Sequence, residues 1–111
     1  LGLGNNAHIG YNEPGTQFAA GCRVQRLTDK TRQQLAWLFT DGASLPEKAV
    51  TMGIRTLTKA RKIMVLALGE VKAKAVFDML YARDDSVIPA AFLQIPADVT
   101  VYVDPDAGRK L

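Results

Sequence analysis

The sequence predicts an α/β protein built on a parallel sheet. Residues 63–68 form an uninterrupted run of six apolar side chains, and residues 99–103 form a second strand-like run that stops at residues 104–106 (DPD). A stretch with helical spacing, residues 70–82, lies between the two runs. Strand, helix and strand at these distances are typical of a parallel sheet. We expect the strand at 63–68 to be buried on both faces, as parallel strands usually are.

The elements expected in the first forty residues are the end of a buried strand at 1–4, a glycine-rich loop at 5–21, a short strand at 23–27 and a helix at 28–39. Thr28 is a good N-cap for this helix, and Asp29 places a negative charge in its first turn, where the helix dipole favours it. Asp41-Gly42 is expected to end the helix.

The remaining elements are shorter or less sharply defined. Residues 49–52 are apolar enough for a strand end or a helix start, and residues 53–60 are expected to be helical with Ile54 and Leu57 facing inward. Residues 89–95, between two prolines, predict a short helix or turn. One side of the helix at 70–82 is expected to carry Val71, Ala75, Val76, Met79 and Leu80.

Composition restricts the class of protein. A chain of 111 residues with 48% hydrophobic and 23% charged residues forms one globular domain at most. Its net charge of +3 is spread along the chain without interleaved aromatic residues, so we expect no nucleic-acid partner. No stretch approaches the roughly 20 apolar residues that span a bilayer, so we expect no membrane partner. The resulting expectation is a soluble, cytoplasmic protein.

Cofactor and metal sites are not expected. The single cysteine, Cys22, has no CxxC or Cys/His cluster around it, so it is expected to be an ordinary thiol. Gly2 and Gly4 match part of a dinucleotide-binding motif, but the third glycine is misplaced and no acidic residue follows at the required distance. We therefore expect no cofactor and no metal.

The first candidate site is the loop after residues 1–4. It holds the only histidine of the chain, His8, with Glu13 five residues later and Asn6 two residues earlier. A neutral imidazole beside a carboxylate can take up a proton, and Asn6 can orient either group by a hydrogen bond. The structural alternative is a loop histidine that bonds to the backbone.

The second candidate is Lys72, which is expected just inside the helix that follows residues 63–68 and Gly69. Free backbone N–H groups and a lysine at a helix N-terminus can bind an anion. A solvated lysine is the alternative. Because ligands bind beyond the carboxyl ends of parallel strands, the loops at 4–15, 69–72 and after Val103 are expected to meet there. Trp37 is expected in the core or at an interface.

Residues 2–15 (GLGNNAHIGYNEPG) strongly resemble the signature of the glucosamine-6-phosphate deaminase/isomerase family, which reads roughly G-x-G-x-[DN]-G-H-I-[AG]-F-N-E-P. Weaker matches continue through residues 23–32, 49–53, 68–69 with 72–73, and 93–94, so the resemblance spans nearly the whole chain. The related 6-phosphogluconolactonases share the glycine–histidine pair but usually lack the Asn-Glu-Pro found at residues 12–14.

The resemblance implies a Rossmann-like three-layer sandwich with a mostly parallel sheet. It also implies conversion of an amino sugar phosphate, such as glucosamine 6-phosphate, to fructose 6-phosphate and ammonia. His8 would match the residue that opens the sugar ring, Glu13 and Asn6 the pair that tunes it, and Lys72 a lysine that holds the substrate phosphate. No cofactor or metal is implied, and a homo-oligomer is compatible because relatives occur as monomers and hexamers.

Some positions depart from the family pattern. Ala7 replaces a usual glycine, and Trp37 stands where the family usually has a phosphate-binding arginine. Arg23 matches a position that helps to bind an allosteric sugar phosphate in some members, but its neighbours differ.

The resemblance also implies that residues 1–111 are the C-terminal portion of a single domain. The family's first half carries a Gly/Ser-rich phosphate loop and the aspartate that takes the C2 proton. We therefore expect the chain alone to be inactive. Two other functions stay open: a 6-phosphogluconolactonase-type hydrolase, and a non-catalytic sugar-phosphate-sensing domain such as those of bacterial transcription regulators that share this fold.

Overall fold

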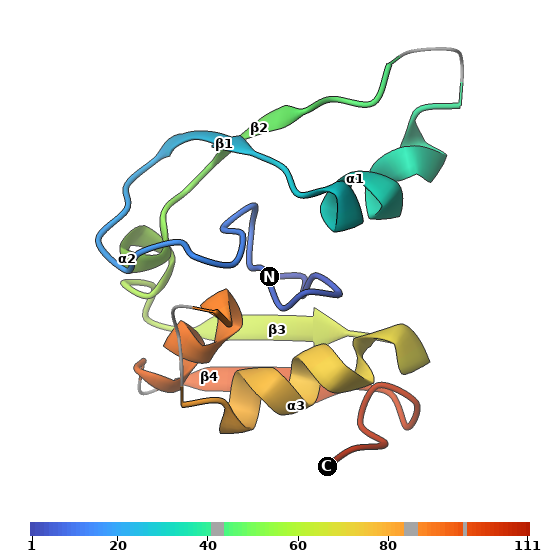
Figure 1. The fold of residues 1–111 in the computed structure, drawn as a ribbon. Coiled ribbons are helices and arrows are strands. Elements are labelled where there is room, and N and C mark those ends of the chain that lie inside the picture. Colours follow the sequence, from blue (N-terminus) through green and yellow to red (C-terminus); the bar gives the residue numbers. More distant parts are fainter. Residues whose placement is uncertain (41–43, 84–86, 97) are drawn as a thin grey trace.

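The computed structural model describes residues 1–40, 44–83, 87–96 and 98–111 (Figure 1). Helices labelled η are 3-10 helices. The elements in chain order are β1 (Arg23–Arg26), α1 (Asp29–Leu35), η1 (Ala36–Leu38), β2 (Lys48–Thr51), α2 (Ile54–Leu57), β3 (Ile63–Ala67), η2 (Glu70–Lys72), α3 (Ala73–Tyr81), η3 (Pro89–Gln94) and β4 (Val99–Val103).

The central sheet is parallel, as the two apolar runs predict. β3 pairs with β4 in a register that sets Val65 opposite Val101. The first residues of the chain run parallel to the other edge of β3, where Gly2 bridges to Leu66 and the Leu66 N–H donates to the Leu1 carbonyl at 2.9 Å. These residues then leave the sheet at its carboxyl end, so the loop that contains His8 starts there.

One face of this sheet is packed and the other is open. α3 and η3 lie against the packed face (Figure 1), where Val65, Val76 and Met79 are almost fully buried. The expectation that β3 is buried on both faces is wrong, because Met64 and Leu66 are 64% and 55% exposed. Side chains alternate between the two faces of a strand, and no described segment covers the face opposite α3.

β1 and β2 form a separate antiparallel pair, which the sequence did not predict as a pair. Arg23 lies opposite Thr51, and Arg26 lies opposite Lys48. The strand expected at 23–27 is confirmed, and the open choice at 49–52 resolves to a strand. The pair lies above the central sheet in Figure 1 and brings the end of β2 to the loop that contains His8.

The helix expected at 28–39 is confirmed in its first half only. Thr28 caps α1, and its side chain accepts a hydrogen bond from the Thr31 N–H. The α-helix ends at Leu35, and η1 continues the chain to Leu38. Trp37 in η1 is 73% exposed, so it does not lie in the core, and its expected alternative place at an interface stays a prediction. The expected helix end at Asp41-Gly42 lies outside the described residues.

Two other helices are shorter than expected. α2 covers only residues 54–57, with Ile54 buried and Leu57 half-buried. The helix expected at 70–82 is divided into η2 and α3, and Val71 is 67% exposed instead of facing the core. Leu80 also lies mostly outside the core, at 37% exposure. The short helix at 89–95 is confirmed as η3.

Among the described helices, none combines the length and the apolar character needed to cross a bilayer. Cys22 is a free, exposed thiol, as expected.

Candidate active site

An open cavity of about 440 Å³ lies where residues 1–4 leave the central sheet at its carboxyl end. Its walls come from the strand end, the loop after it, α1 and η2. The lining residues are Leu1, Gly2, Leu3, Gly4, His8, Gly10, Tyr11, Thr31, Gln34, Leu35 and Lys72. The structure therefore brings His8 and Lys72, which are 64 positions apart in the sequence (72 − 8), to one cavity.

The backbone of residues 4–8 folds back on itself to place His8. The Ala7 N–H donates to the Gly4 carbonyl and the Gly4 N–H donates to the His8 carbonyl, each at 2.9 Å. Ala7 is buried and has a φ of +59°, a conformation that glycine adopts more easily. The loop thus tolerates the extra Cβ where the family signature has glycine.

Gly4 gives the imidazole ring its space. A Cβ added at Gly4 would overlap the ring atoms of His8. The first glycine-rich turn of the chain is therefore a packing surface for the histidine, and any larger residue at position 4 has to displace the ring.

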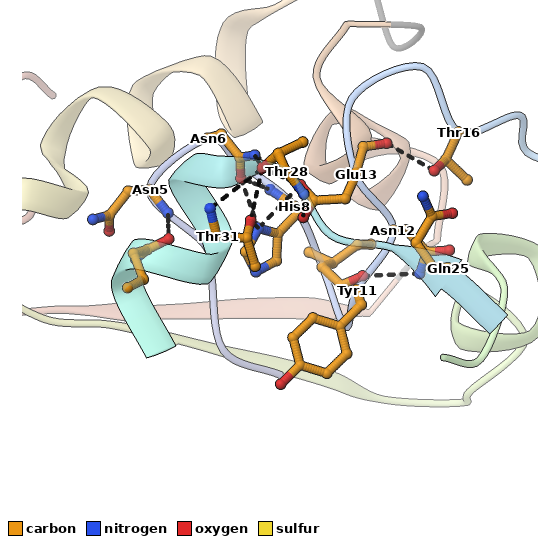
Figure 2. Close-up of polar contacts among 12 residues, drawn as sticks. Asn5, Asn6, His8, Tyr11, Asn12, Glu13, Thr16, Gln25, Thr28 and Thr31 are labelled. Carbon is orange, nitrogen blue, oxygen red and sulfur yellow. Dashed lines mark hydrogen bonds and ion pairs between the residues drawn. The ribbon is translucent and has the colours of Figure 1, made fainter. Parts of the chain in front are cut away.

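The hydrogen bonds of Asn6 determine which ring nitrogen of His8 carries the hydrogen (Figure 2). Asn6 Nδ2 donates to Glu13 Oε2 at 2.8 Å, so its Oδ1 is the atom 2.6 Å from His8 Nδ1. An amide oxygen only accepts, so this assignment puts the hydrogen on Nδ1. The lone pair of Nε2 is then left without a hydrogen-bond partner in the described parts of the chain.

Glu13 is the buried anchor of this group, with a side chain only 3% exposed. Its Oε1 accepts the backbone N–H of Thr28 at 3.2 Å, and its Oε2 also lies 3.7 Å from His8 Nδ1. Asn6, His8 and Glu13, which the sequence singled out, therefore lie together.

Two threonines at the start of α1 complete this hydrogen-bonded group. The sequence did not identify either of them as a site residue. Thr31 Oγ1 lies 3.2 Å from His8 Nδ1 and 3.1 Å from Thr28 Oγ1. Thr31 is 1% exposed, on a helix whose other described residues are not buried. A lone small polar residue in a polar helix gives no periodic signal, so only the fold reveals it.

Asn12 was also missed and holds the loop in place. Its Nδ2 donates to the carbonyls of Ile9 and Met52, and its Oδ1 accepts from Arg23 Nη1 at 3.0 Å. Arg23 also donates to Thr16 Oγ1 at 3.2 Å. This buried amide fastens the His8 loop to the end of β2 and to β1.

Burial governs the charge state of the two basic groups in the cavity. Burial lowers the pKa of His8 below its ordinary value, against the opposing effect of the Glu13 carboxylate, and the positive charge of Lys72 lowers it further. Burial also lowers the pKa of Lys72. His8 is therefore a neutral imidazole near neutral pH.

Lys72 lies just inside the helical segment that follows β3, as expected, but in its 3-10 part and not in the α-helix. It is the last residue of η2 and the N-cap of α3, and the N–H of Gly69 is already bonded to Asp104 at 3.0 Å. The Gly69 N–H is thus not free for an anion, and the Lys72 side chain itself is the cationic group on the cavity wall.

No group of three or more metal-ligating His, Cys, Asp or Glu side chains occurs within residues 1–40, 44–83, 87–96 and 98–111. The site is an imidazole, a carboxylate and an amide in a fixed hydrogen-bonded chain, with one lysine across the cavity. These features define an α/β protein with a candidate site beyond the carboxyl edge of a parallel sheet, built from groups of the kind that proton transfer uses.

The comparisons with known proteins agree with this class. The family described as glucosamine-6-phosphate isomerases/6-phosphogluconolactonase matches residues 1–102, and the chain belongs to this family. It is 44% identical over 111 residues to the glucosamine-6-phosphate deaminase of Clostridioides difficile and 40% identical to that of Halalkalibacterium halodurans. In both cases the match covers 100% of this chain and 45% of the relative, so the chain spans about half the length of these proteins.

Solved structures show the same relationship. A monomeric glucosamine-6-phosphate deaminase superposes with a TM-score of 0.93 at 41% identity, covering 99% of this chain and 46% of that one. The 6-phosphogluconolactonase from Trypanosoma cruzi shares the fold, with a TM-score of 0.73 at 21% identity over 99% of this chain and 39% of that one.

Proposed function

We propose that the full-length protein that contains these residues is a sugar-phosphate aldose–ketose isomerase/deaminase. It converts an amino sugar phosphate such as glucosamine 6-phosphate to fructose 6-phosphate and ammonia. The observation that carries the proposal is the hydrogen-bonded chain Glu13–Asn6–His8, whose His8 lines the same cavity as Lys72. The relatives at 40–44% identity support the substrate class.

On this proposal His8 opens the sugar ring. Nε2 takes the proton of the anomeric hydroxyl and delivers it to the ring oxygen, so that the C1–O5 bond breaks as the C1 carbonyl forms. The imidazole needs to be neutral before this step and cationic during it. Glu13, 3.7 Å from Nδ1, stabilises the transient positive charge, and Asn6 keeps the hydrogen on Nδ1.

Lys72 binds the substrate phosphate as a point charge. A lysine ammonium donates three hydrogen bonds and suits a phosphate without fixing its orientation. We assign removal of the C2 proton to a carboxylate outside these 111 residues, in line with the resemblance. We also propose that the open face of β3 and β4 is covered in a three-layer domain of which residues 1–111 form one part.

Ammonia release from glucosamine 6-phosphate by the full-length protein tests the proposal. We expect turnover by the wild type and a loss of about 100-fold or more in His8→Gln, in line with the usual contribution of a general acid–base group. A matched control is Gln17→Asn, an exposed amide whose shortening leaves the Glu13–Asn6–His8 chain intact. Hydrolysis of 6-phosphogluconolactone, or sugar-phosphate binding without turnover, would replace the proposal by the hydrolase or the sensing function.

A further inference from the structure

The carboxyl ends of the two paired strands β3 and β4 are joined by one side chain. Asp104, the first residue after β4, accepts the N–H of Gly69 with both carboxylate oxygens at 3.0 Å. Its Oδ1 also accepts the Ala107 N–H at 2.8 Å. Asp104 is partly exposed and is not among the residues that line the cavity. Its carboxylate therefore binds the turn after β3 from outside the site.

This turn carries Lys72. Gly69 has a φ of +86°, which a residue with a side chain rarely adopts, and η2 begins at the next residue. The Lys72 N–H then donates to the Gly69 carbonyl at 3.0 Å and closes the turn. The orientation of the Gly69 peptide therefore determines where η2 starts and where the Lys72 side chain leaves the backbone.

We propose that Asp104 is a positioning residue for Lys72, holding the ammonium group at the place where it meets the substrate phosphate; this inference rests on the proposed function of Lys72. The carboxylate accepts two backbone N–H groups in a fixed geometry, and hydrogen bonds to an ionised acceptor are stronger than those between neutral groups. Burial of part of the Lys72 side chain limits the adjustment that the lysine itself can make.

A second contact joins the same two segments but is expected to matter less. Arg109 forms an ion pair with Glu70 in η2. Both side chains are more than half exposed, and exposed ion pairs usually contribute little. The effect of removing this ion pair therefore serves as a reference for the effect of removing Asp104.

The experiment uses the full-length protein and measures KM for glucosamine 6-phosphate, kcat, and the inhibition constant of inorganic phosphate. The variants are Asp104→Ala, Asp104→Asn, Lys72→Met, and Asp104→Ala combined with Lys72→Met. Asp106→Ala is the matched control, because this exposed aspartate lies two residues away with no described side-chain hydrogen bond. Glu70→Gln tests the exposed ion pair.

We expect Asp104→Ala to raise KM and the phosphate inhibition constant roughly tenfold, a size in keeping with the misplacement of a binding group, while the pH profile of kcat is unchanged. Asp104→Asn, which keeps Oδ1 as an acceptor, should lie between the wild type and Asp104→Ala. Asp106→Ala and Glu70→Gln should stay within about twofold of the wild type. In the Lys72→Met background, Asp104→Ala should add almost nothing, because the group that it positions is gone.

Equal effects of Asp104→Ala in the two backgrounds, or an effect on kcat alone, would overturn the inference. If Asp104→Ala does not fold, the same comparison is made with Asp104→Asn. Failure of the proposed function is distinguishable: Lys72→Met would then leave phosphate affinity unchanged. If Lys72→Met weakens phosphate binding but neither Asp104→Ala nor Asp104→Asn does, only the inference about Asp104 is rejected.

Discussion

His8 Nδ1 lies 2.6 Å from Asn6 Oδ1, and this amide separates the imidazole from the carboxylate of Glu13. An amide oxygen orients the ring by accepting its hydrogen bond but brings no negative charge. The geometry therefore fixes the tautomer while His8 stays neutral to a lower pH, because burial already disfavours the imidazolium. Many members of the resembled family have aspartate at this position.

Replacing Asn6 by Asp should raise the pKa of His8. A carboxylate within hydrogen-bond distance of the imidazole favours the charged form of the ring. On the proposed function the ring-opening step needs neutral imidazole, so we expect activity to fall as the pH drops through the pKa of His8. The acid limb of kcat/KM should therefore lie below the ordinary pKa of a histidine in the wild type and move upward in Asn6→Asp. Gln17→Glu, which adds a charge at an exposed position, should leave it in place.

Replacing Gly4 by Ala should displace the imidazole ring. The added Cβ would overlap ring atoms that Asn6 and Thr31 hold in position, so the ring has to turn away. A misplaced catalytic group costs about 100-fold in rate. Steady-state kinetics of Gly4→Ala in the full-length protein measures this loss. Gly21→Ala is the control, since nothing lies within 4 Å of its added Cβ, and comparable losses in both variants would argue against a ring-packing role.

Replacing Trp37 by Arg restores the phosphate-binding arginine that the resembled family usually has at this position. Trp37 is 73% exposed on η1, which follows the helix that lines the cavity. If phosphate recognition lacks an arginine here, Trp37→Arg should lower KM for glucosamine 6-phosphate by about tenfold through a charge-assisted contact. Trp37→Ala separates the loss of the indole from the gain of the guanidinium. A raised KM in both Trp37→Ala and Trp37→Arg would show that the indole itself binds substrate.

The acid stability of the protein should depend on Asp104. Hydrogen bonds from the backbone N–H groups of Ala107 and Gly69 hold the pKa of Asp104 below its ordinary value. A carboxyl group with a depressed pKa contributes stability above its unfolded pKa and loses it as the pH falls through its folded pKa. Asp104→Asn should therefore melt at a lower temperature than the wild type at pH 7, with the difference shrinking at low pH. A constant difference in Tm between pH 7 and pH 2 would contradict this assignment.

The open face of β3 and β4 should make the 111-residue chain associate when it is studied alone. Met64, Leu66 and Tyr102 on this face are each more than half exposed, and contiguous exposed apolar groups drive association. The double substitution Met64→Lys with Leu66→Lys should lower the association. Sedimentation velocity of the two chains tests this, and a clean monomer for the unsubstituted chain would count against an unfilled face.

The sequence predicts those parts of the molecule that depend on local pattern. β3 and β4 follow from apolar runs, α1 from its Thr28 cap, and the His8 loop from its signature residues. It does not predict contacts that depend on chain folding. The pairing of β1 with β2, the contact of Thr31 with His8, and the bond of Asp104 to the Gly69 turn join residues up to 35 positions apart.

The wrong burial predictions, for β3 and for the helix after it, arise because a sequence pattern does not show what packs against each face. A run of six apolar residues fits a strand covered on both faces, but the described chain supplies packing for one face only, through α3 and η3. Val71 and Leu80 fit the apolar stripe of one helix, yet the switch from η2 to α3 turns Val71 outward. Periodicity reports which residues can share a face and not which faces are covered.

The most direct test of the account is the tautomer of His8, read from the ¹⁵N chemical shifts of its ring in the full-length protein, with His8→Gln identifying the signals. The account predicts a hydrogen on Nδ1 and an unprotonated Nε2 at neutral pH, since Asn6 Oδ1 can only accept. A hydrogen on Nε2 at neutral pH would leave this atom unable to take the proton of the sugar, and would contradict the account.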